Sequence, residues 1–132
     1  MTEEQFALAK RAVACNGWRW MPGMLIHTGF RMVWVDETTF RSFDERANEM
    51  YGSTECLLPD ITDPATVGCL LALVREAFPG CHAEPNGAPE WDGYDEAERD
   101  NWWAVFTCGP HRLMANGATE AEALVAALEA AP

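Results

Sequence analysis

An apolar helical segment bounded by proline at both ends lies in the middle of the chain and limits the folds available to the rest. Asp63 is a favourable helix N-cap, and Pro64 follows at the first helical position, where its missing N–H removes no hydrogen bond. Apolar residues then recur every three or four positions until Pro79-Gly80, which ends the pattern. These signals predict a core helix over residues 64–77.

Two further helices are indicated near the ends of the chain. Thr2 followed by Gln5 forms a capping-box pattern, and apolar residues at helical spacing after it predict a helix over residues 3–15. Thr119 and Glu122 form a second capping box, which precedes an amphipathic stretch rich in alanine and leucine. Helices are therefore expected at the beginning, middle and end of the chain.

The segment between the first two helices has the composition of strands. Residues 24–28 and 30–35 are β-rich runs separated by Gly29, and they predict a hairpin or meander. Residues 41–50 are charged and only weakly amphipathic, and we interpret them as a short helix or a loop insertion.

The segment between the last two helices contains a loop and a second hairpin. Residues 81–100 hold turn-forming prolines and glycines among acids and predict a loop. Residues 102–107 and 112–115 are strand candidates joined by Gly109-Pro110. The order predicts an α+β layered sandwich, in which an antiparallel sheet of about four to five strands carries about three helices.

The length of 132 residues fits a single domain. Within it we expect an N-terminal helix and hairpin over residues 1–50, followed by the core helix, acidic loop, second hairpin and final helix over residues 51–132. No apolar run approaches the length of a membrane-spanning helix, and the first residues lack a secretion signal. We therefore expect a cytoplasmic protein.

Charge is distributed unevenly along the chain. The formal net charge is −12, and residues 51–132 hold 14 acids against three bases, whereas residues 1–50 are almost balanced. Such a field repels phosphate backbones, so direct binding of nucleic acid is disfavoured and basic partners or cations are favoured. The alternative is that the charge serves only solubility.

The densest acidic segment, residues 84–100, carries the partner-binding prediction. It contains seven acids and one arginine, with two aromatic residues among them. Acids can bind an Arg/Lys-rich surface, and Trp and Tyr often anchor interfaces. The alternative is a solvated loop, and the spacing lacks the pattern of an EF-hand calcium loop. The predicted binding residues are Glu90, Trp91, Asp92, Tyr94, Asp95, Glu96, Glu98 and Asp100.

No pattern in the chain predicts catalysis or a cofactor. The five cysteines include no Cys-x-x-Cys pair, and their odd number favours reduced thiols. A zinc site built from Cys81, His82, Cys108 and His111 is a weak alternative, because the ligand spacing is easily met by chance. No serine lies in a Gly-x-Ser-x-Gly elbow and no glycine-rich phosphate loop is present. We therefore expect no catalytic residues, no metal and no enzyme activity.

Two stretches resemble a known group of proteins. Residues 58–77, LPDITDPATVGCLLALVREA, and residues 117–132, GATEAEALVAALEAAP, resemble small hypothetical phage and prophage proteins of the phage ABA sandwich domain type. The resemblance implies an α/β sandwich and a bacterial host cell. It implies no activity and no catalytic residues.

Two functional hypotheses follow. The first is a non-enzymatic phage or prophage accessory protein whose acidic segment binds a basic, nucleic-acid-handling host protein, with inhibition as one outcome. The second is a small structural or assembly protein that associates with itself, as in a homodimer, and whose charge serves only solubility. Neither hypothesis includes a membrane or direct contact with nucleic acid.

Overall fold

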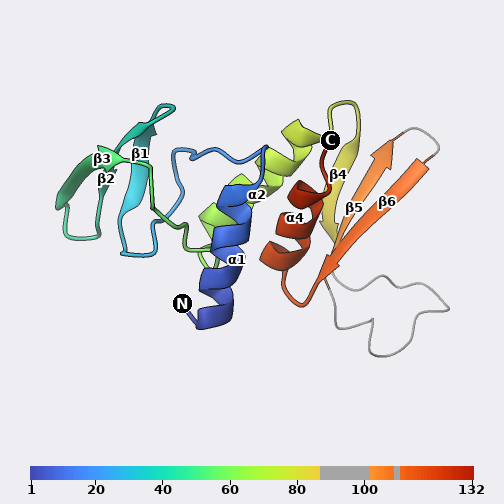
Figure 1. The fold of residues 1–132 in the computed structure, drawn as a ribbon, viewed down its shortest axis with the longest axis horizontal. Helices are drawn as coiled ribbons and strands as arrows, with labels where there is room; N and C mark the ends of the chain where they lie inside the picture. The colour runs from blue at the N-terminus through green and yellow to red at the C-terminus, as the bar shows by residue number, and fades with distance from the viewer. Residues whose placement is uncertain (87–101, 109–110) are drawn as a thin grey trace. The chain divides into compact units, whose positions relative to one another are not determined.

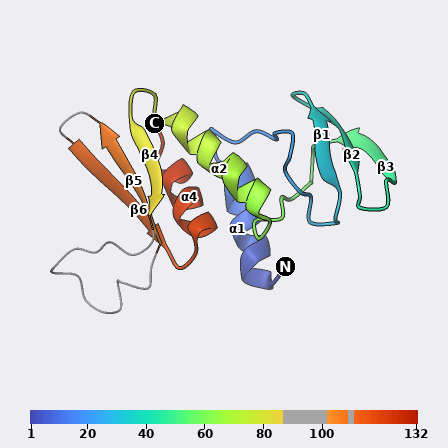
Figure 2. The ribbon, with the colours of Figure 1, turned by 180° about the vertical axis from the view of Figure 1, so that it is seen from behind.

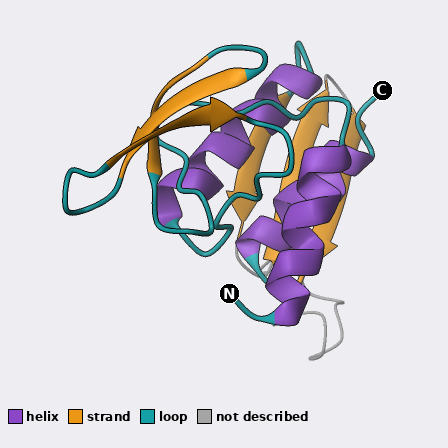
Figure 3. Ribbon diagram, turned by 60° about the vertical axis from the view of Figure 1, so that its left-hand side comes forward, coloured by secondary structure: helices purple, strands orange, loops and turns teal. Residues whose placement is uncertain are grey.

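The structure is a computed structural model that describes residues 1–86, 102–108 and 111–132, with side chains described for residues 1–81 and 114–132 (Figure 1). These residues form helices and antiparallel strands, which confirms the predicted α+β class (Figure 3). In chain order the elements are α1 (Glu3–Ala14), β1 (Arg31–Val35), β2 (Thr39–Phe43), β3 (Glu49–Ser53), α2 (Pro64–Ala77), β4 (His82–Asn86), β5 (Trp102–Cys108), β6 (His111–Gly117) and α4 (Glu120–Glu129).

The described chain forms two compact units. The N-terminal unit comprises Met1–Ala14 and Trp18–Cys69, and the C-terminal unit comprises Cys15–Gly17 and Leu70–Pro132. Each unit holds one three-stranded antiparallel sheet, β1-β2-β3 or β4-β5-β6. The described strands thus form two small sheets, where the sequence predicted one sheet of four to five strands. Short connections join β1 to β2, β2 to β3 and β5 to β6, and helix α2 separates the two sets of strands along the chain.

The N-terminal sheet is an antiparallel meander (Figures 1 and 2). Phe40 and Ser42 of β2 are buried, whereas Arg41 between them is exposed. Because successive side chains of a strand point to opposite faces, one face of the sheet is buried and the other is open. A bulge in β1 lies between Met32 and Trp34.

The interpretation of residues 41–50 as a short helix or loop insertion is wrong at both ends of the segment, since residues 41–43 belong to β2 and residues 49–50 belong to β3. The turn between these strands is organised by Asp44, whose side chain accepts the N–H groups of Arg46 at 2.9 Å and Asn48 at 2.8 Å. Ala47 completes the turn with a φ of 61°, a region that favours glycine. The charged residues that weakened the strand signal lie on the open face of the sheet or in this turn.

The predicted strand over residues 24–28 is reduced to isolated bridges. Leu25 pairs with Arg31, and Ile26 pairs with Pro59. The backbone of Met32 in β1 makes two hydrogen bonds to this segment, on the outer side of the strand. The Met32 N–H donates to the Met24 carbonyl, and the Met32 carbonyl accepts the N–H of residue 23, both at 2.8 Å. Met24 and Ile26 are fully buried, so their apolar character reflects the core and not a continuous ladder.

Helix α1 begins as its capping box predicts. The N–H of Gln5 donates to the Thr2 hydroxyl at 3.2 Å, and the Thr2 N–H donates to the Gln5 side chain at 2.6 Å. Leu8, Ala9 and Ala12 are buried on one side of the helix. The predicted first helix is confirmed, and so is the core helix over residues 64–77, which matches α2.

A hydrogen-bond network joins the start of α2 to the sheet within the N-terminal unit. Asp63 caps α2, since its Oδ2 accepts both the N–H and the hydroxyl of Thr66, at 2.9 and 3.0 Å. Arg31 of β1 donates to both oxygens of Asp63, at 2.8 and 3.0 Å. The Thr66 hydroxyl in turn accepts the N–H of Leu25 at 2.9 Å. One carboxylate therefore fixes a helix start, a strand and the segment before it.

Acid is expected to weaken this network within a defined range of pH. The Arg31 guanidinium, followed by the Thr66 hydrogen bonds, lowers the pKa of Asp63 to about 2, against the cost of its burial. The unfolded chain therefore binds the proton more tightly, so the stabilisation is complete above about pH 4 and disappears as the pH falls through about 2. Because Arg31 is 44% exposed, we expect a loss of about 1 to 2 kcal/mol.

Urea unfolding of the wild type and Asp63→Asn between about pH 5 and pH 2 measures the contribution of the Asp63 carboxylate to the free energy of unfolding. The stability difference between the two proteins should shrink as the pH falls. Glu45→Gln, which removes a carboxylate outside the network, should run parallel to the wild type. A constant difference between the wild type and Asp63→Asn over this range would contradict the assignment.

The C-terminal unit is a three-stranded sheet with α4 packed against β4, β5 and β6 (Figure 1). Helix α4 begins at the predicted capping box, where the N–H of Glu122 donates to the Thr119 hydroxyl at 3.2 Å. Its buried face is formed by small and branched apolar residues: Ala121, Ala123, Leu124, Val125, Ala127 and Leu128. The predicted second hairpin is confirmed as β5 and β6.

Residues 82–86 form strand β4, although the sequence predicted a loop there. Pro85 lowers the strand signal because proline donates no ladder hydrogen bond. In the described sheet β4 is an edge strand, where a proline is tolerated. Its pairing with β5 is decided by residues about twenty positions away, so local sequence did not reveal it.

The expectation of five reduced thiols is wrong for Cys81, which is disulfide-bonded. Cys15, Cys56 and Cys69 take part in no disulfide. The disulfide also removes Cys81 as a zinc ligand in this state, because zinc binds thiolates. Among the described residues, no helix combines the length and apolar character needed to cross a membrane.

Candidate functional site

The candidate site is a pocket of about 620 Å³ that lies wholly within the N-terminal unit. We call it the Trp18 pocket. Its functional side chains are two indoles, three carboxylates and a thiol: Trp18, Trp20, Asp36, Glu37, Glu55 and Cys56. The guanidinium of Arg19 and a set of aliphatic side chains complete the lining. The pocket therefore combines aromatic surface with an excess of negative charge.

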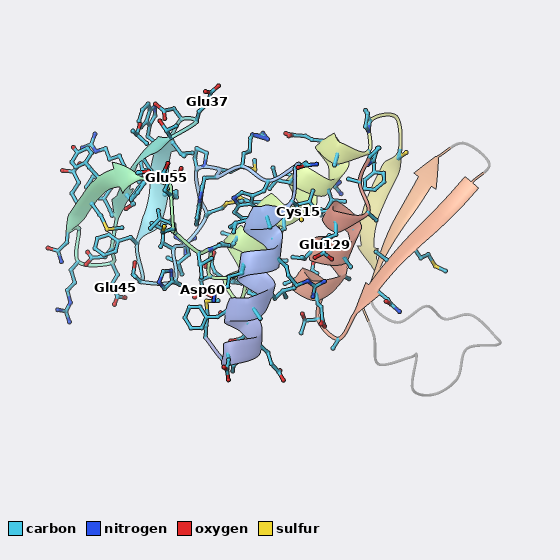
Figure 4. The ribbon with its side chains drawn as sticks, in the orientation of Figure 1. Cys15, Glu37, Glu45, Glu55, Asp60 and Glu129 are labelled. Atoms are coloured by element: carbon cyan, nitrogen blue, oxygen red, sulfur yellow. The ribbon has the colours of Figure 1, made fainter. Side chains whose placement is uncertain are left out.

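The carboxylates come from two neighbouring connections of the N-terminal sheet. Asp36 and Glu37 join β1 to β2, and Glu55 follows β3. Because the strands are antiparallel, the end of β1 and the end of β3 lie at the same end of the sheet. Figure 4 labels Glu37 and Glu55 in these two connections.

Asp36 is held in place by its own turn. Its Oδ1 accepts the N–H groups of Thr38 and Thr39, at 3.0 and 2.8 Å, and the Thr39 hydroxyl at 2.9 Å. The backbone hydrogen bonds, from Thr38 first, lower the pKa of Asp36. The residue therefore brings a fixed negative charge to the pocket at neutral pH.

The turn after β3 places Glu55 and Cys56. The Ser53 hydroxyl accepts the N–H of Glu55 at 3.1 Å, and the N–H of Leu57 donates to the Thr54 carbonyl at 3.4 Å. Cys56 occupies the third position of this turn with a φ of 64°, where glycine or asparagine is usual. A non-glycine residue in such a conformation carries strain, and strained residues concentrate at functional sites.

The two indoles form the aromatic wall. The rings of Trp18 and Trp20 meet edge to face, with centroids 5.6 Å apart and planes at 82°. The buried Nε1–H of Trp18 has no hydrogen-bond partner in the described structure. A buried donor without an acceptor costs about 1 to 3 kcal/mol.

This arrangement suits a ligand that carries positive charge and apolar surface. Carboxylates attract ammonium and guanidinium groups, and indole faces add cation–π attraction. The lining includes one thiol but no histidine, so no Cys/His pair for nucleophilic catalysis is formed at this pocket.

The residues predicted from sequence as partner-binding lie outside the described residues. They are Glu90, Trp91, Asp92, Tyr94, Asp95, Glu96, Glu98 and Asp100. Of the possible zinc set, Cys81 is disulfide-bonded, and the side chains of His82, Cys108 and His111 are not among those described. Within the described residues, no group of three or more potential metal ligands is found.

Sequence reasoning missed the Trp18 pocket because its parts are separated in the chain. The sequence Asp36-Glu37-Thr38-Thr39 is a side-chain-capped turn signal that could have located one of the carboxylates. Nothing in the local sequence places Glu55 beside it, since that depends on the β2–β3 pairing.

No protein-family model matches this chain, and neither a curated protein nor a solved structure matches it.

Proposed function

We propose that the chain is a non-enzymatic protein-binding factor whose Trp18 pocket receives a basic, extended segment of a partner protein. The observation that carries the proposal is the placement of Asp36, Glu37 and Glu55 around one pocket with Trp18 and Trp20. A peptide that contains arginine or lysine offers the cation and the aliphatic stem that this lining complements.

The overall charge supports the same class of partner. A net charge of −12 attracts basic surfaces at a distance and raises the rate of their encounter. Residues 84–100, with seven acids, extend this field in the C-terminal half of the chain. We propose that the acidic segment attracts the partner and that the Trp18 pocket supplies the specific contacts.

The resemblance to phage and prophage proteins supports a setting for this activity. We propose a phage or prophage accessory protein that acts in the cytoplasm of a bacterial host. Its partner would be a basic protein that handles nucleic acid, and occupation of that basic surface would inhibit it. Because a disulfide is unusual in a reducing cytoplasm, the binding measurements are made with and without a reductant.

The test is a titration with a short arginine–glycine peptide, followed by tryptophan fluorescence and calorimetry. Glu37→Gln combined with Glu55→Gln removes two pocket charges and should weaken binding roughly tenfold. Glu3→Gln combined with Glu4→Gln removes the same charge at the start of α1 and should change affinity less than about twofold. Equal losses in the two double variants would show that only the net charge matters and would overturn the pocket assignment.

A third variant separates the role of the acidic segment, residues 84–100, from that of the Trp18 pocket. Asp92, Asp95, Glu96, Glu98 and Asp100 are replaced together by Asn or Gln. We expect a slower association and a weaker salt dependence, with the fluorescence change at the pocket retained. A complete loss of the fluorescence change would show that residues 84–100, and not the Trp18 pocket, form the binding site.

A further inference from the structure

A second interaction surface lies at the open edge of the N-terminal sheet. In the described structure β3 pairs only with β2, and most of its residues are exposed (Figures 1 and 2). An unpaired edge strand presents backbone donors and acceptors that can pair with another strand. Natural edge strands prevent this with charges, prolines, bulges or a covering segment.

The opposite edge of the same sheet has such protection. Strand β1 is interrupted by the bulge between Met32 and Trp34. The backbone of Met32 is already engaged by residues 23 and 24 through two hydrogen bonds of 2.8 Å. A strand from outside therefore cannot extend a regular ladder along β1.

Strand β3 lacks each of these protections. It contains no proline and no bulge in its pairing with β2. Its one charged residue, Glu49, is neutralised by a salt bridge to Arg41. The guanidinium of Arg41 also lies over the ring of Tyr51, with its central carbon 5.7 Å from the ring centroid.

The hydrogen bonds at the two ends of β3 show which of its backbone groups face outward. The carbonyl of Asn48 accepts from Asp44 at 3.1 Å, and the N–H of Thr54 donates to Thr38 at 3.0 Å. Residues 48 and 54 therefore face β2. Because backbone groups alternate in direction along an antiparallel strand, the even-numbered residues between them face β2 as well.

The outward-facing residues are then Glu49, Tyr51 and Ser53. An antiparallel copy of the same strand, related by a twofold axis at Tyr51, would place Tyr51 opposite its own copy and Glu49 opposite Ser53. Every outward N–H and C=O of these residues then finds a partner, and no two carboxylates are opposed. The strand is self-complementary in this register.

We infer that β3 is a homodimerisation edge, which pairs with β3 of a second copy of this chain to join the two N-terminal sheets. Tyr51, 65% exposed, then packs against its copy on the open face. Since each copy carries a charge of −12, added salt should strengthen the dimer, whereas it should weaken binding of a basic peptide.

Sedimentation measurements over a range of concentration and salt test the inference. The wild type should show a monomer–dimer equilibrium. Tyr51→Glu should raise the dimer dissociation constant roughly tenfold or more, because two carboxylates meet at the axis. Within the monomer, Arg41 can pair with the new carboxylate and so preserve the sheet. Trp34→Glu, which changes an exposed aromatic residue of β1, is the matched control and should leave the dimer intact.

Cysteine cross-linking tests the register independently. In a Cys56→Ser background, Tyr51→Cys should form a covalent dimer under mild oxidation. Met50→Cys should not, because in this register position 50 lies opposite position 52 of the copy, which leaves the two introduced cysteines diagonally offset and too far apart for a disulfide. Three results would each overturn the inference: a monomer at every concentration, equal weakening by Trp34→Glu and Tyr51→Glu, or equal cross-linking at positions 50 and 51.

Discussion

Replacement of Gly117 by alanine is expected to destabilise the protein by about 2 to 4 kcal/mol. Gly117 ends β6, directly before the capping box of α4. A Cβ atom there would lie 2.6 Å from the backbone nitrogen of Ala123 and 2.6 Å from the Cβ of Glu122. These atoms belong to the first turn of a packed helix, so the overlap requires either α4 or the end of β6 to move.

Gly68→Ala provides the matched control. Gly68 lies in α2, is exposed and has open space where its Cβ would be. Alanine restricts the unfolded chain and has the higher helix propensity, so this variant should be more stable by about 0.5 to 1 kcal/mol. Thermal or urea unfolding of both variants measures the effects. Equal effects of the two substitutions would refute the close approach between β6 and α4.

The second large loss of stability is expected when Thr66 is replaced. This residue is fully buried in the first turn of α2. Its hydroxyl accepts the N–H of Leu25 and donates to Asp63. Thr66→Val keeps the shape and branching of the side chain but leaves the Leu25 N–H without its acceptor. We expect a loss of about 2 to 3 kcal/mol of unfolding free energy.

Thr66→Ser separates the hydroxyl from the methyl group. Serine retains both hydrogen bonds and removes one methyl, which should cost about 1 kcal/mol. The serine variant should therefore be more stable than the valine variant, as measured by urea unfolding near neutral pH. The reverse order would show that packing of the methyl group, and not the hydrogen-bond network, makes Thr66 important.

The two proposed surfaces can be distinguished in solution by their opposite responses to salt. The binding proposed for the Trp18 pocket depends on attraction between unlike charges, and salt screens that attraction. The β3 edge brings together two copies of an acidic chain, and salt screens their repulsion. A Tyr51→Glu variant that remains monomeric but still binds the basic peptide would establish that the two activities are separate.

The helices could be predicted from the sequence because their signals are local. Thr2, Asp63 and Thr119 each supply a side-chain acceptor to N–H groups two or three residues later, and Pro64 is compatible only with the start of a helix. Proline and glycine after position 78 mark the end of α2. These interactions lie within a few residues, so the local sequence was sufficient to place the helix boundaries.

The two strands flanking Gly109-Pro110 were predictable for a similar reason. Their partners are adjacent in the chain, and the turn between them has a strong composition signal. Residues 41–50 and 82–86 were not predicted as strands, because charged residues and Pro85 obscure the local pattern. Whether these segments form strands is decided by pairing with a neighbouring strand and by which face is buried, and only the tertiary structure contains that information.

The sequence by itself therefore determined the α+β class, the helix boundaries and the acidic net charge. The tertiary structure decided that the described strands form two sheets. It also brought Trp18, Asp36 and Glu55 to one pocket and left β3 as the open edge. The physical reason is distance along the chain: caps and turns act over a few residues, whereas a pocket and a free edge depend on contacts between segments far apart in sequence.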